Sequence, residues 1–180
     1  MQQRVFVALA CLCVILLVGG TASAARPQPV EDPGTGKWGY MDPRTKRLVI
    51  PYRYAIADRF NAQGAAFALA DDGWVYIDVR GTVLARPFLF DNGPDDFSEG
   101  LARCVSQGKM GYFNKKGEIV IPAVYDFGLP FEGGLAPVCV DCVKEYDGEH
   151  YRVVRGSWGC VNKKGVLVRP LSAPGPDCAK

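Results

Sequence analysis

The sequence predicts an all-β fold of tandem β-hairpin or meander repeats, with three full units and one partial unit. A pattern of strand, tight turn, strand and proline occurs four times, around Trp38, Trp74, Met110 and Trp158. Its apolar runs are short, rich in aromatic and β-branched residues, and bounded by Gly, Asn, Asp or Pro, which is typical of strands. After the N-terminal segment, no long window keeps the apolar spacing of an amphipathic helix.

Residues 108–122 show the pattern most fully. The run Lys-Met-Gly-Tyr-Phe-Asn is followed by the loop Lys-Lys-Gly and then by Glu-Ile-Val-Ile-Pro. Glycine at the last loop position can adopt the left-handed conformation that closes such hairpins with a bulge. The proline has no N–H group and therefore ends the second strand. The first three copies start 36 residues apart and the fourth starts 48 residues after the third, so an insert precedes it.

Each of the first three units has a second half. An aromatic residue lies three residues after the proline, at Tyr54, Phe90 and Tyr125, and a Phe and a further apolar run follow. The four units span about 36–71, 72–107, 108–142 and 157–171, with an insert at 143–156.

Aromatic residues recur at the same places in these units. One hairpin cannot bury its apolar face alone, so we predict that the repeated aromatic residues pack within and between units. Stacking platforms for sugars are the alternative role for such rings. The residues concerned are Trp38, Trp74, Trp158, Tyr40, Tyr76, Tyr112, Phe60, Phe97 and Phe131.

Together these residues resemble the WG-repeat family, a bacterial tandem β repeat named for its Trp-Gly pair. Its pattern is roughly G-x-W-G-Y-[ILMF]-[DN]-x-x-G-x-[IVL]-V-I-P, then Y-D, then F-x-[ED]-G-L-A-x-V, and residues 36–170 follow it. Val75 replaces the Gly of the pair in the second copy, Met110 the Trp in the third, and Cys160 the Tyr in the fourth. The resemblance implies a repeat architecture and does not imply a defined activity.

The first 24 residues have the features of a secretory signal peptide. Arg4 precedes an apolar run over residues 5–18, and Ala22 and Ala24 stand at the spacing of a cleavage site. Cleavage after Ala24 predicts a secreted or periplasmic protein without a stable membrane span. An uncleaved anchor is the alternative, although the run is shorter than the roughly 20 residues that cross a bilayer. Losing Arg4 leaves 20 Lys and Arg against 19 Asp and Glu, a balance that does not favour nucleic acid or membrane binding.

Proline-rich segments flank the repeats. Residues 25–35 contain three prolines, and residues 172–180 contain two prolines and a glycine. Because proline interrupts a β ladder, we predict a flexible leader and a flexible tail.

The hairpin loops are basic. If the units stack in register, the loops line up as a rim that could hold an anionic polysaccharide, lipid head group or protein, while Asp95, Asp96, Glu99 and Glu132 lie on the opposite turns. The alternative is that these are solvated residues that keep exposed strand edges from pairing wrongly. The basic residues are Arg44, Lys46, Arg47, Arg80, Lys115, Lys116, Lys163 and Lys164.

The mature chain keeps five cysteines, Cys104, Cys139, Cys142, Cys160 and Cys178. Export favours disulfides, and an odd number leaves at least one cysteine free or paired with another chain. A bridge from Cys139 or Cys142 to Cys160 would tie down the insert. The alternative for Cys139 and Cys142 is a redox pair, which would favour a helix N-terminus rather than a strand end.

The sequence carries no familiar catalytic motif. His150, the only histidine, lies in the insert, and its spacing from the cysteines matches no familiar zinc site. We therefore predict no enzymatic activity, no cofactor and no metal, and a scaffold that binds an envelope protein or a glycan. The alternatives are a structural envelope protein that forms disulfide-linked oligomers, such as a covalent homodimer, and a small secreted enzyme.

Overall fold

The computed structural model describes residues 25–148 and 150–178. The signal peptide predicted for residues 1–24 lies outside the described residues. The described part contains short antiparallel strands and no helix, which confirms the all-β prediction. It accordingly offers no helix of the length and apolar character needed to cross a membrane.

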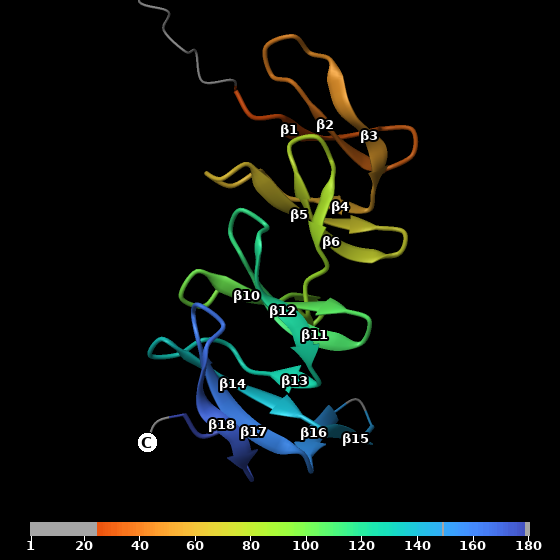
Figure 1. Ribbon diagram of the computed structural model, residues 1–180. Helices are drawn as coiled ribbons and strands as arrows, with labels where there is room; N and C mark the ends of the chain where they lie inside the picture. Colours follow the sequence, from red (N-terminus) through yellow and green to blue (C-terminus); the bar gives the residue numbers. More distant parts are fainter. Residues whose placement is uncertain (1–24, 149, 179–180) are drawn as a thin grey trace, which may run out of the picture.

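Three-stranded antiparallel meanders repeat along the chain. The first three are β1 (Gln28–Glu31), β2 (Trp38–Met41) and β3 (Leu48–Tyr54); β5 (Ala65–Ala70), β6 (Gly73–Asp78) and β7 (Val83–Ala85); and β10 (Leu101–Ser106), β11 (Lys109–Asn114) and β12 (Ile119–Tyr125). The last consists of β14 (Leu135–Val140), β17 (Ser157–Asn162) and β18 (Leu167–Ala173). Figure 1 shows the meanders one above another in chain order, as an open stack.

Short strands connect and extend the meanders. β4 (Ile56–Ala57) adds to β5, and β13 (Phe127–Gly128) adds to β14. Two separate hairpins are formed by β8 (Leu89–Phe90) with β9 (Gly93–Pro94), and by β15 (Val143–Asp147) with β16 (His150–Val154). The second of these hairpins is the insert at 143–156.

The second, third and fourth meanders each cross the boundary between two repeat units of the sequence. β5, at the end of the first unit, pairs with the hairpin β6–β7 that opens the second unit. In the first meander, β1 supplies the first strand for the hairpin β2–β3. The structure therefore corrects the flexible leader predicted for residues 25–35. Pro29 is tolerated in this ladder because β1 is an edge strand.

The C-terminal segment is also held in place. β18 reaches Ala173, and a disulfide joins Cys160 in β17 to Cys178. Nη1 of Arg169 donates a 3.0 Å hydrogen bond to the carbonyl oxygen of Asp177. The tail predicted to be flexible from residue 172 is thus attached to the last sheet as far as residue 178.

A repeated side-chain hydrogen bond shapes the hairpin loops. Asp42, Asp78, Asn114 and Asn162 occupy the same loop position, and each accepts backbone N–H bonds from residues two to four positions later. Such bonds mimic a backbone turn. In the last three hairpins a glycine with positive φ closes the loop.

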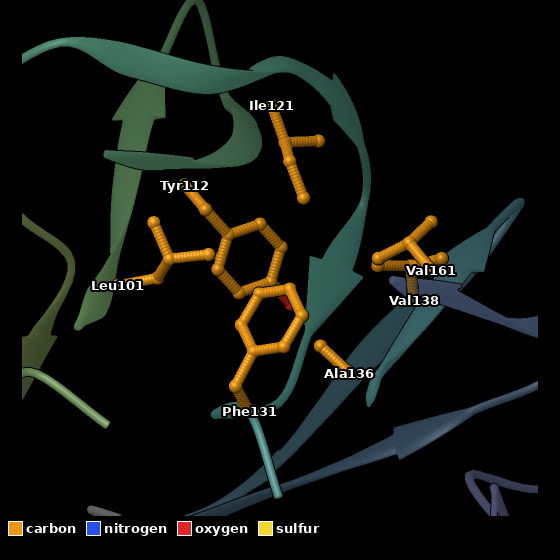
Figure 2. Close-up of a cluster of buried hydrophobic side chains, with 7 residues drawn as sticks. All are labelled: Leu101, Tyr112, Ile121, Phe131, Ala136, Val138 and Val161. Carbon is orange, nitrogen blue, oxygen red and sulfur yellow. The ribbon is translucent and has the colours of Figure 1, made fainter. Parts of the chain in front are cut away.

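The hydrophobic core lies between successive meanders. Tyr40 and Ile50 of the first meander pack against Val75 of the second. Two further clusters join the second meander to the third and the third to the fourth. Figure 2 shows the last of these clusters, where the rings of Tyr112 and Phe131 meet with centroids 5.0 Å apart. Because the apolar side chains are shared between neighbours, each meander is stabilised by burial against the next.

The repeated aromatic residues fall into two groups by burial. The central tyrosines of the first three hairpins and Phe131 are no more than 1% exposed. Trp158 is buried, whereas the other four are half-buried. Three of these four pack against core clusters, and the fourth, Trp74, borders the groove described below. The half-buried residues are Trp38, Trp74, Phe60 and Phe97.

Candidate functional site

The glycine of the Trp-Gly pair lies where two backbones pass close together. A Cβ atom at Gly39 would lie 2.6 Å from the carbonyl oxygen of Ile50, and one at Gly159 would lie 2.7 Å from that of Arg169. A Cβ atom at Gly111 would clash with β12 in the same way. Only glycine fits here, because the neighbouring atoms belong to the backbone and cannot rotate away.

This close approach lets the second strand of the hairpin bend. The strand register shifts at this point in the first, third and fourth meanders. Beyond the shift the strand pairs again with the residue before the glycine, so that Trp38 faces Tyr54 and Met110 faces Tyr125. A bulge of this kind turns the strand. The bent strand therefore covers the outer edge of the central strand.

The second meander departs from this arrangement at Val75, which stands where the others have glycine. Its side chain is 1% exposed and packs with Tyr40 and Ile50 in the first core cluster. β7 ends at Ala85 after three residues, whereas β3 and β12 have seven residues each. Within the described residues no strand pairs with Trp74 on this edge of β6. We attribute the early end of β7 to the Cβ atom of Val75, which occupies the space that the bent second strand takes beside glycine in the other hairpins.

The chain after β7 then takes a shorter path to the next sheet. The N–H groups of Asp58 and Phe88 donate to equivalent carbonyl groups of β5 and β10. Asp58 lies eight residues after Ile50, the residue paired with the central tyrosine. Phe88 lies only three residues after Ala85, which has the same pairing. The second unit therefore omits the five residues that run past the central strand in the first.

The second unit instead has an additional hairpin, β8–β9, after this shortened path. Phe90, which corresponds by sequence to Tyr54, is 66% exposed, whereas Tyr54 is 2% exposed. Leu89 is also exposed. Asp91 and Asn92 have positive φ, as the tight turn of a two-residue hairpin loop requires. The relocation leaves apolar side chains at the surface and uncovers the edge of β6.

The uncovered edge borders a groove of about 1000 Å³, which we call the β6 groove. Its walls come from the start of β6, the segment from β7 to β8, the end of β10, and β12 of the next meander. The lining is mostly apolar and includes Trp74, Val83, Leu84, Pro87, Phe88, Leu89, Val105, Ile119 and Pro122.

Two charged residues line the groove, and they neutralise each other. Nη2 of Arg86 lies 2.5 Å from Oδ2 of Asp72, and both side chains are exposed. The hydrogen bond from Arg86 lowers the pKa of the Asp72 carboxyl. The groove therefore offers apolar contact and backbone groups rather than a net charge.

A buried ion pair supports one wall of the groove. Arg103 donates from Nε and Nη2 to the two carboxylate oxygens of Asp95, at 2.8 and 2.7 Å, and both side chains are buried. Its Nη1 donates to the carbonyl oxygen of Gly128 at 3.1 Å, and its guanidinium lies 4.4 Å from the centre of the Phe88 ring. This bidentate pair attaches the relocated segment to β10. Asp95 is thus buried rather than part of an exposed acidic turn.

The insert hairpin contacts the same ring through Lys144. Its Nζ lies 5.5 Å from the ring centre of Phe88, 5.4 Å from that of Phe127 and 4.6 Å from that of Tyr151. Burial, and then the charge of Arg103, lowers the pKa of Lys144. These cation–π contacts hold the insert against the wall of the groove. No sequence motif marked Lys144 or Arg103 for this role.

The basic hairpin loops do not form a separate rim. In the last three hairpins the loop glycine lies against the preceding hairpin, and Figure 1 shows the loops pointing along the stack. Arg80 pairs with Asp78 of its own loop, and Nζ of Lys163 lies 2.7 Å from Oε2 of Glu99, so basic and acidic turns meet. The eight exposed side chains are those of Arg44, Lys46, Arg47, Arg80, Lys115, Lys116, Lys163 and Lys164.

The cysteines pair differently from the predicted bridge. Disulfides join Cys139 to Cys142 and Cys160 to Cys178, so a bridge from Cys139 or Cys142 to Cys160 is wrong. The first lies just before the insert, between β14 and β15, and the second attaches the tail. Cys104 is unpaired and 3% exposed, and burial raises its pKa to about 11. Its thiol is buried in the core, at the wall of the β6 groove.

His150 lies exposed in β16, at the end of the insert hairpin. The cysteines that could have joined it in a zinc site are bonded in disulfides. Across residues 25–148 and 150–178, no three His, Cys, Asp or Glu side chains gather in a way that could hold a metal ion.

Two stretches of the chain, residues 38–74 and 110–141, match the family described as WG containing repeat. A search of curated proteins and a search of solved structures gave no match. The two stretches begin at Trp38 and Met110, and residues 75–109, with the irregular hairpin and its Val75, lie outside both. The resemblance to the WG-repeat family is therefore confirmed over these two stretches, and the second unit departs from the family pattern.

Proposed function

We propose that the chain is an exported, non-catalytic binding module that holds its partner in the β6 groove. The observation that carries this proposal is the groove itself, an apolar hollow of about 1000 Å³ beside an unpaired strand edge. The other three hairpins bend their second strand over this edge. In the second unit the corresponding edge of β6 is accessible.

The lining of the groove favours binding over catalysis. Its charged residues, Asp72 and Arg86, are paired with each other. Its thiol, Cys104, has a pKa of about 11 and is therefore protonated at neutral pH, whereas nucleophilic cysteines have lowered pKa values. An apolar hollow with few polar groups is a common form of binding site.

Two features support export to the cell envelope. Cleavage after Ala24 would leave three residues before β1, so the first sheet would remain complete. The two disulfides suit an oxidising compartment. Mass spectrometry of the exported protein tests this part of the proposal: a mature chain that starts at Ala25 is expected, and a chain that retains its first 24 residues would contradict it.

The binding proposal is tested by comparing two tryptophans at equivalent repeat positions. Trp74 borders the groove, whereas Trp38 is covered by the strand that carries Tyr54. We expect a partner captured from envelope extracts to bind Trp74→Ala about tenfold or more weakly, because tryptophan is enriched among the residues that dominate binding energy. Trp38→Ala should retain its affinity. Equal affinity of the two variants would contradict binding in the groove.

A further inference from the structure

We propose that the β6 groove accepts an extended peptide segment, which adds as a strand to the open edge of β6 and places an aromatic side chain beside Trp74. This inference rests on the proposed function and names the class of partner that the groove takes. It is carried by the other units of the stack, in which the same position is already filled by a strand.

The first and third units show how such a strand fits. After the bulge, residues 51–55 run beside the start of β2, with Tyr54 opposite Trp38. Residues 122–126 run beside the start of β11 in the same way, with Tyr125 opposite Met110. In both units this strand places an aromatic residue opposite the repeat position that Trp74 occupies in the second unit.

The edge of β6 presents backbone groups that such a strand could bond. β5 pairs with the whole of β6 on one side, from Gly73 to Asp78. On the other side the ladder to β7 begins only at Tyr76, so the edge from Gly73 to Val75 has no strand partner there among the described residues. An extended peptide that joins a sheet edge gains main-chain hydrogen bonds, and neighbouring pockets select its side chains.

The chain itself is prevented from closing this edge, whereas a separate peptide is not. The chain's own strand would have to pass directly over Val75, where the first and third units have only Gly39 and Gly111. A separate peptide has no covalent link to β7 and need not cross that point. Its strand can begin beyond Val75 and run outward along Trp74 and Gly73.

The chemistry of the groove indicates what the peptide carries. The chain's own path is five residues shorter in the second unit, so the vacant track holds about four or five extended residues, or roughly 16 Å. The groove lining has no net charge, and Trp74, Val83 and Ile119 line it. A mainly apolar segment that carries at least one large aromatic residue is therefore preferred. A glycan would find few polar side chains there, chiefly Ser106 and Gln107.

The chain supplies suitable probes for this proposal. Two synthetic peptides with blocked ends reproduce residues 51–57 and 122–128, the segments that fill the equivalent position in the first and third units. Calorimetry should show that the whole mature protein binds both peptides. Replacing the tyrosine that corresponds to Tyr54 or Tyr125 with alanine should weaken binding about tenfold, as should a proline in place of Val124, which removes a main-chain donor.

Variants of the protein locate the binding. Trp74→Ala should lose affinity for both peptides by about tenfold or more, and Trp38→Ala should bind them as the unmodified protein does. Ile119→Asp provides a second test that does not depend on Trp74, and it should also weaken binding of both peptides because Ile119 lines the groove. Ile119 is 49% exposed, so a charge there is compatible with folding. Bound peptide should also slow amide hydrogen exchange in residues 73–75 and leave residues 37–39 unchanged.

The outcomes separate this inference from the proposed function. Binding that depends on Trp74 and slows exchange at residues 73–75 supports the peptide. Neutral oligosaccharides that bind in a Trp74-dependent way, while the peptides do not, would overturn the inference and leave a binding groove. A dimer that sediments as such and dissociates in Trp74→Ala would identify a second copy as the occupant and also overturn it. If Trp74→Ala changes no binding at all, both proposals fail.

Discussion

Replacing Gly111 with alanine tests the physical reason for the Trp-Gly pair. The added Cβ atom would lie 2.7 Å from the amide nitrogen of Ala123 and from the carbonyl carbon of Pro122, where ordinary contacts begin at 3.4 Å. These atoms belong to the backbone of β12, so the strand must move away by roughly 0.7 Å or more. The movement would disturb the pairing of Met110 with Tyr125.

The expected cost follows from three contributions. Overpacking of this kind costs about 1–3 kcal/mol, and each weakened ladder hydrogen bond costs about 1 kcal/mol. Replacing a strand glycine with alanine returns about 0.5–1 kcal/mol through the unfolded chain. With about one ladder hydrogen bond weakened, we therefore expect Gly111→Ala to lower the free energy of unfolding by roughly 1–3.5 kcal/mol.

Urea unfolding followed by circular dichroism, with the disulfides intact, measures this change. Gly93→Ala is the matched control, because a Cβ atom at Gly93 meets nothing within 4 Å and its φ is not in the left-handed region. Its free energy of unfolding should stay within about 0.5 kcal/mol of the unmodified protein. If Gly111→Ala unfolds at the same urea concentration as Gly93→Ala, the explanation of the glycine by close backbone approach is refuted.

Three further predictions follow from the charged and thiol groups. Asp95→Ala should lower the free energy of unfolding by about 3–5 kcal/mol in urea, because it leaves the guanidinium of Arg103 buried and unpaired; an unchanged midpoint would contradict the pair's role. Burial holds the pKa of Cys104 at about 11, so iodoacetamide should label it at neutral pH only after unfolding, as mass spectrometry will show; labelling of the native protein would contradict this. The hydrogen bond from Lys163 lowers the pKa of Glu99, so its stabilising effect is present above the unfolded-state pKa and is lost as pH falls through the folded-state pKa. The difference in urea midpoint between the unmodified protein and Glu99→Gln should therefore vanish in acid; a difference that persists there would contradict the link.

The stack of β hairpins could be predicted from sequence because the same residue types return at the same spacing. The tyrosine after the Trp-Gly pair marks the most buried positions, such as Tyr40 and Tyr112. The strand at residues 28–31 could not be predicted from its own residues, because Pro29 argues against it. It forms because residues 28–31 pair with the open edge of the strand that starts at Trp38.

The candidate site was visible in the sequence only as a departure. Val75 stands out against the family pattern, but its effect depends on how closely the next strand passes, which the sequence does not state. The relocation of Phe90 and the pairing of Arg103 with Asp95 are likewise consequences of the path that the chain takes after β7. Cysteine pairing also depends on that three-dimensional path, because the five cysteines of residues 25–178 allow many combinations.

Amide hydrogen exchange of the unbound protein tests the open edge of β6 most directly. The three-residue windows 37–39, 73–75, 109–111 and 157–159 occupy equivalent positions in the four hairpins. Because the second strand covers the edge in the first, third and fourth meanders, we predict that the amides facing this edge exchange slowly there. In residues 73–75 the corresponding amides should exchange fast. Equal protection in all four windows would show that β6 is covered and would contradict both the groove and the peptide that we assign to it.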